Sequence, residues 1–128
     1  RKKDLIVTSG GKKIAPQSIE KLLEASPFID TAFLYGDGKK FLTALLVVKE
    51  MAELPIAQHV DAVNLQLSHF ETIKKYTLLT KPFSVESGEL TPTLKLRRRE
   101  IAKKYHDLLE KMYASDHEES VAPRRKFL

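Results

Sequence analysis

Cysteine and tryptophan are absent from this sequence of 128 residues, and glycine occurs only five times. Without cysteine, disulfides and thiolate metal sites are excluded, and a reducing cytosolic setting is permitted. No apolar run approaches the roughly 20 residues that a membrane-spanning helix needs. The four histidines are scattered without a metal-ligand spacing, so we assign no metal.

The remaining composition is that of one globular domain, with 42% hydrophobic and 30% charged residues. The net charge of +5 favours anionic partners, which include nucleic acid, phosphorylated cofactors and acidic membrane surfaces. The sequence begins at Arg1 with neither methionine nor a signal-peptide pattern. We therefore expect it to be cut out of a longer protein.

The first half of the chain shows hairpin and helix signals. Short β-prone runs at 4–8 and 12–15 flank Ser9-Gly10-Gly11, which predicts a β-hairpin. Pro16 opens a segment of helical spacing that ends before Pro27.

Two further strands are predicted at 29–35 and 41–49, paired antiparallel around the Asp-Gly turn at 36–38. The run 42–48 is nearly continuous in apolar residues, as expected of a central strand covered on both faces.

In the second half, the spacing predicts a helix over 56–67, a strand near 75–79 and a final helix over 96–112. We expect residues 1–113 to form one α+β domain, in which helices flank a small antiparallel sheet behind an N-terminal hairpin. Residues 114–128 lose the pattern and are predicted to be a flexible tail.

The segment 88–99, Gly-Glu-Leu-Thr-Pro-Thr-Leu-Lys-Leu-Arg-Arg-Arg, places Lys95 at the end of a constrained loop before a basic helix. It resembles the C-terminal lysine motif of acyl-adenylate-forming enzymes, in the version found in long-chain fatty acyl-CoA synthetases. Many members of that superfamily have glycine before the lysine, whereas this chain has Leu94. Residues 1–6, 9–16 and 18–20 are similar to the hinge motif that opens the same domain. The resemblance covers about residues 1–113.

The resemblance implies a mobile C-terminal domain of an AMP-forming fatty acid–CoA ligase, whose N-terminal domain holds ATP, Mg²⁺ and the fatty acid. Lys95 would bridge the carboxylate and the α-phosphate during adenylation. Lys3 would be the hinge, and Gly10, Gly11 and Lys12 would approach CoA during thioester formation. The chain alone would be inactive.

The implied location is cytoplasmic, and association with a membrane surface stays open. The main alternative is a basic nucleic-acid-binding or interaction module without enzymatic activity. Five aromatic residues lie in or near strand-like runs, where core packing is favoured over base stacking, namely Phe33, Tyr35, Phe41, Tyr76 and Phe83. We therefore expect no nucleic acid partner.

Overall fold

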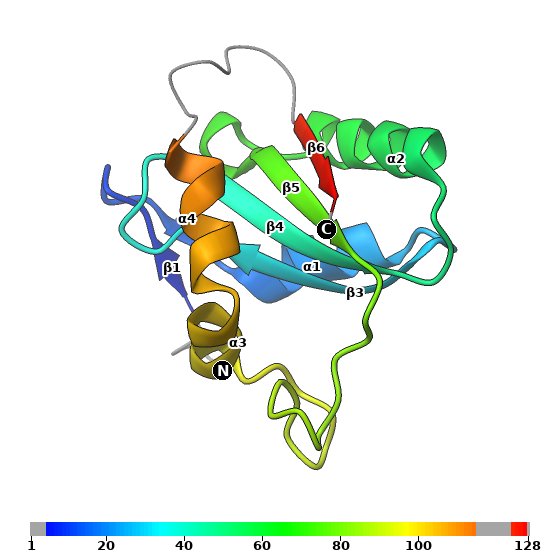
Figure 1. The fold of residues 1–128 in the computed structure, drawn as a ribbon. Coiled ribbons are helices and arrows are strands. Elements are labelled where there is room, and N and C mark those ends of the chain that lie inside the picture. The colour runs from blue at the N-terminus through cyan, green and yellow to red at the C-terminus, as the bar shows by residue number, and fades with distance from the viewer. Residues whose placement is uncertain (1–4, 115–123, 128) are drawn as a thin grey trace.

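The computed structural model describes residues 5–114 and the backbone of residues 124–127, which form an α+β domain (Figure 1). The elements in chain order are β1 (Ile6–Val7), β2 (Lys13–Ile14), α1 (Pro16–Glu24), β3 (Ile29–Tyr35), β4 (Leu42–Val48), α2 (Glu53–Leu65), the 3-10 turn η2 (His69–Glu71), β5 (Ile73–Leu79), α3 (Arg98–Lys104), α4 (His106–Ala114) and β6 (Arg124–Phe127). The predicted fold class is confirmed.

The N-terminal hairpin and the first helix follow the sequence signals. Strands β1 and β2 pair antiparallel, with Ile6 opposite Ile14. Pro16 lies at the start of α1, where a missing backbone N–H removes no helical hydrogen bond.

The main sheet has the strand order β3-β4-β5-β6. Strands β3 and β4 pair antiparallel across the predicted turn, but β4 pairs parallel to β5, and β5 parallel to β6. The sheet is therefore mixed rather than wholly antiparallel, because the crossover through α2 returns the chain to the end of the sheet where β4 begins.

Helices cover both faces of the sheet, and all seven residues of β4 are buried. One core packs Leu46 of β4 with residues of α1 and α2. The opposite core packs Leu45 and Val47 with Ile101 of α3 and Leu109 of α4. Figure 1 shows α4 in front of the sheet and α1 behind it. The prediction of a central strand covered on both faces is confirmed.

The final helix differs from its prediction as one helix over 96–112. The chain forms α3 and α4, which meet at Tyr105 with a backbone outside helical geometry (φ −106°, ψ 23°). The Tyr105 ring packs 6.1 Å from the ring of Phe83, measured between centroids. This bend lets Ile101 and Leu109 enter the same core.

The tail differs as well. Residues 124–127, within the segment predicted as a flexible tail, form β6, which pairs with 75–78 of β5. This pairing satisfies a β5 edge that would otherwise be open. The rest of the expected tail, 115–123 and Leu128, lies outside the described residues. Within the described part of the chain, no helix is long and apolar enough to cross a membrane.

Candidate functional site

Lys95 lies near the end of a tight loop that closes on itself before α3. An isolated β-bridge joins Leu90 to Leu96 across the loop. The Thr91 N–H donates to the Lys95 carbonyl at 2.8 Å, and the Leu94 N–H donates to the Thr91 carbonyl at 2.7 Å. The Lys95 side chain is exposed, and no carboxylate of the described residues pairs with its ammonium. The loop therefore presents a free cation on a fixed backbone.

The backbone of this loop is strained at Leu94. Its φ of +65° is the only positive value among the described non-glycine residues. A left-handed backbone costs an L-residue about 1–2 kcal/mol, whereas glycine adopts it freely. The side chain of Leu94 is 69% exposed, so no core packing offsets the cost. This geometry accounts for glycine as an alternative residue at this position.

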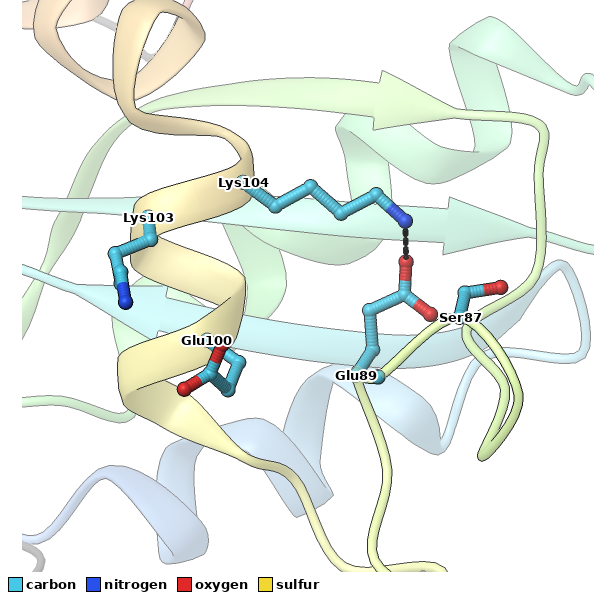
Figure 2. A pocket seen from close by; sticks show the side chains of 6 residues that line it. Ser87, Glu89, Glu100, Lys103 and Lys104 are labelled. Atoms are coloured by element: carbon cyan, nitrogen blue, oxygen red, sulfur yellow. Dashed lines mark hydrogen bonds and ion pairs between the residues drawn. The ribbon is translucent and has the colours of Figure 1, made fainter.

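The base of the loop is held by the buried carboxylate of Glu89. Lys104 donates to Glu89 Oε2, and the Ser84 N–H donates to Oε1 at 3.0 Å. Figure 2 shows Lys104 reaching from α3 to Glu89 across a pocket of about 260 Å³. Burial disfavours the charged form of Glu89, but the hydrogen bonds from Lys104 and Ser84 outweigh it and lower the pKa. Glu89 thus stays ionised and ties the loop to α3.

Arg98, three residues after Lys95, forms a bidentate ion pair with Glu20 of α1. The two N···O distances are 2.7 and 2.6 Å, and the Glu20 side chain is 6% exposed. Glu20 also accepts the Leu34 N–H at 2.7 Å, on the outer edge of β3. Burial raises the pKa of Glu20, although Arg98 and the Leu34 N–H both act to lower it. The pair fixes the start of α3 to α1.

The tip of the N-terminal hairpin contains the predicted Gly10, Gly11 and Lys12. Gly11 has a φ of +84°, which requires glycine at this turn position. A β-carbon on Gly10 would meet only the Thr8 hydroxyl, at 4.0 Å, so the turn itself does not require glycine there. The Lys12 ammonium lies 5.3 Å from the centre of the Phe70 ring. Gly10 is therefore an open position on a well-defined turn.

The hairpin is tied to the body of the domain. The Ser9 N–H donates to the Lys39 carbonyl at 2.9 Å, and the Gly38 N–H donates to the Val7 carbonyl at 2.8 Å. Asp37 Oδ1 accepts the Val7 N–H at 3.0 Å. The turn between β3 and β4 therefore holds β1.

The structure does not bring Lys95 and Gly10 into one pocket. Figure 1 shows the loop before α3, in yellow-green, and the dark-blue hairpin at separate places on the domain. Lys3 lies outside the described residues, so its hinge role stays a prediction.

The sequence reasoning missed Glu20 and Glu89 as the groups that anchor these segments. The available signal was a carboxylate on the apolar face of α1, four residues after Pro16 and three before Leu23. Arg98 belongs to the basic run at 97–99, but its guanidinium is engaged by Glu20.

Comparison with known proteins connects these features to a family. The family model for the AMP-binding enzyme C-terminal domain matches residues 3–117. The chain belongs to this family. It is 35% identical to the long-chain-fatty-acid–CoA ligase FadD15 of Mycobacterium tuberculosis, over 88% of the chain and 23% of that protein. It is 33% identical to the long-chain-fatty-acid–CoA ligase ACSBG2 of Gallus gallus, over 89% of the chain and 20% of that protein. The chain thus spans less than a quarter of the length of these relatives.

Two solved structures contain a region with the same fold as this chain. The adenylation domain of a carboxylate reductase from Mycobacterium chelonae matches with a TM-score of 0.78 and 27% identity, over 89% of this chain and 20% of that one. The A domain of a Segniliparus rugosus carboxylic acid reductase, solved with AMP and a carboxylic acid, has the same fold, with a TM-score of 0.79, 23% identity and coverage of 90% and 20%. The resemblance inferred from the two motifs is confirmed.

The other charges of this C-terminal domain bear on its candidate ligands. Among the described residues, no cluster of three or more His, Asp or Glu side chains is placed to hold a metal ion. Lys104 and Arg98 of α3 are engaged by internal carboxylates. Of the five aromatic residues predicted to pack in the core, Phe33, Tyr76 and Phe83 are buried, whereas Tyr35 and Phe41 are half-buried. Two of the positive charges of α3 are therefore paired with carboxylates of the same domain.

We predict that Arg98→Met destabilises the chain by roughly 3 kcal/mol at about pH 8, because it leaves the buried carboxylate of Glu20 without its cationic partner. The pKa of Glu20 in the folded chain is already raised above its ordinary value of 4.5. Protonated Glu20 therefore stabilises the fold fully below pH 4.5, and this stabilisation is lost as the pH rises through the folded-state pKa. Losing Arg98 raises this pKa further. In urea denaturation, Arg98→Met should therefore lower the free energy of unfolding less at about pH 4.5 than at about pH 8.

Arg97→Met is the matched control, because Arg97 is half-exposed and lies 4.0 Å from Glu100. Arg97→Met should lower the free energy of unfolding by less than about 0.5 kcal/mol. Equal losses for Arg97→Met and Arg98→Met, or a loss for Arg98→Met that does not change with pH, would refute the structural role given to Glu20.

Proposed function

We propose that this chain is the mobile C-terminal domain of an ATP-dependent, AMP-forming long-chain fatty acid–CoA ligase. The family membership and the names of its relatives support the ligase class. The observation that carries the proposal is the exposed Lys95 on a hydrogen-bonded, strained loop, within the matched lysine motif. A solvated surface lysine would not require such a backbone.

In the first half-reaction, the fatty acid carboxylate attacks the α-phosphate of ATP, and an acyl-phosphate bond forms as pyrophosphate leaves. Two anionic groups must approach each other for this step. The Lys95 ammonium would lie between a carboxylate oxygen and an α-phosphate oxygen, offset their repulsion and stabilise the charge of the transition state. Lysine suits this role because it is a compact cation on a flexible stem.

In the second half-reaction, the CoA thiol attacks the acyl carbon and AMP leaves. The domain would rotate about Lys3, withdraw Lys95 and bring the hairpin tip to the thiol. Gly10 would then pass close to the pantetheine arm, with Gly11 and Lys12 beside it. The open space at Gly10 supports this role, because the turn does not itself require glycine there.

ATP, Mg²⁺ and the fatty acid would be held by the N-terminal domain of the same enzyme. The described residues do not fit a Mg²⁺ site of their own, since no metal-binding cluster occurs among them. The isolated chain would accordingly turn over no substrate. We place the enzyme in the cytoplasm, with peripheral membrane association as a further proposal.

Replacing Lys95 with alanine in the full-length enzyme should separate the two half-reactions. We expect acyl-AMP formation, followed as pyrophosphate release, to fall by roughly a hundredfold or more, since a preorganised charge at the reacting oxygens is lost. Thioester formation from supplied acyl-AMP and CoA should stay within about twofold.

Lys81→Ala is the control for the removal of an exposed lysine, and it should leave both half-reactions unchanged. Equal losses in the two half-reactions of the Lys95 variant, or no loss of adenylation, would rule out the role given to Lys95.

Gly10→Ala should affect function without affecting the fold. The added methyl group meets only ordinary contact with Thr8, so the free energy of unfolding should change by less than about 0.5 kcal/mol. The variant should form thioester about tenfold more slowly or show a higher KM for CoA, while its formation of acyl-AMP is retained. If both half-reactions match the wild type, Gly10 is only a turn residue.

A further inference from the structure

The backbone of Lys95 is bound on both sides by a single residue, Thr91. The Thr91 N–H donates to the Lys95 carbonyl at 2.8 Å. The Lys95 N–H donates to the hydroxyl oxygen of Thr91 at 3.0 Å. Both polar backbone groups of the lysine are therefore satisfied by one neighbour, four residues earlier in the chain.

The Thr91 hydroxyl contributes the side-chain part of this clamp. Its oxygen also lies 3.1 Å from the hydroxyl oxygen of Thr93. The Thr91 carbonyl accepts the Leu94 N–H at 2.7 Å, which holds the strained residue next to the lysine. Loss of the Thr91 hydroxyl would remove the hydrogen-bond partner of the Lys95 N–H, while the backbone bond from Leu94 to Thr91 would remain.

The direction of the Lys95 side chain depends on this backbone. Its ammonium has no carboxylate partner among the described residues, and its side chain is exposed rather than packed. The turn at Leu94 and the two hydrogen bonds to Thr91 thus fix the backbone of Lys95, from which its side chain extends. A rotation at the α-carbon would be amplified along the four methylenes to the ammonium.

We propose that Thr91 is a positioning residue for the adenylation half-reaction, which aims Lys95 through a hydroxyl-to-backbone hydrogen bond without touching substrate. The inference rests on the proposed function of Lys95. It adds a residue whose chemistry, a hydroxyl that accepts a backbone N–H, can be removed while the shape of the side chain is kept.

The test compares variants of the full-length enzyme that contains this chain. Thr91→Val removes the hydroxyl at nearly constant volume, and Thr91→Ser retains it. We expect Thr91→Val to lower kcat for pyrophosphate release about tenfold while thioester formation from supplied acyl-AMP and CoA stays within about twofold. Thr91→Ser should restore pyrophosphate release to within about twofold of the wild type.

Thr93→Val is the matched control, because Thr93 is exposed and, among the described residues, its hydroxyl bonds only to that of Thr91. It should leave both half-reactions within about twofold of the wild type. Should Thr91→Val lower the melting temperature, Thr91→Ala provides a second variant without the hydroxyl, and only the ratio of the two half-reaction rates is then compared.

Lys95→Ala is measured in the same assays, so that failures can be told apart. If Lys95→Ala abolishes pyrophosphate release but Thr91→Val and Thr91→Ala do not slow it, the positioning role is wrong and the proposed function stands. If Lys95→Ala leaves pyrophosphate release intact, the proposed function itself fails. Equal slowing of both half-reactions by Thr91→Val, or no rescue by Thr91→Ser, would reduce Thr91 to a general structural role.

Discussion

The ion pair between Glu20 and Arg98 is the contact on which the arrangement of this domain depends. Glu20 is buried, accepts a backbone N–H from the edge of β3 and accepts one hydrogen bond from each terminal guanidinium nitrogen of Arg98. Such a carboxylate is costly to bury unless these partners are present. The cationic partner of Glu20 is Arg98, the first residue of α3. The ion pair therefore fixes the start of the helix that follows the lysine loop.

This contact joins the two segments that the proposed reaction uses. Helix α1 follows directly on the N-terminal hairpin, while Arg98 lies three residues after Lys95. Further contacts secure each end, since Asp37 holds the hairpin and Glu89 holds the base of the loop. The lysine and the hairpin are thus carried by one unit but exposed at different places, as expected of a domain that delivers them in turn.

Local signals were sufficient for much of this fold. The Gly-Gly and Asp-Gly turns, Pro16 and the apolar run of β4 depend on neighbours in the sequence, and each was read correctly. The Arg98 pairing could not be read in this way, because its partner lies 78 residues away. The break at Tyr105, whose ring packs against Phe83, and the pairing of β6 with β5 both involve residues distant in the sequence. The role of Lys95 is predicted from its motif, whereas its two hydrogen bonds to Thr91 are visible only in the structure.

In the proposed reaction, the hairpin and the lysine loop move as one body. Since this chain has no cysteine, spin labels can be introduced at the exposed positions Lys13 and Ser87 without further substitutions in the domain. The distance between the two labels would be measured by double electron–electron resonance in the full-length enzyme, once with a non-hydrolysable acyl-AMP analogue and once with CoA added. The account predicts one narrow distance distribution, unchanged between the two states. A shift, or a second population in either state, would contradict it.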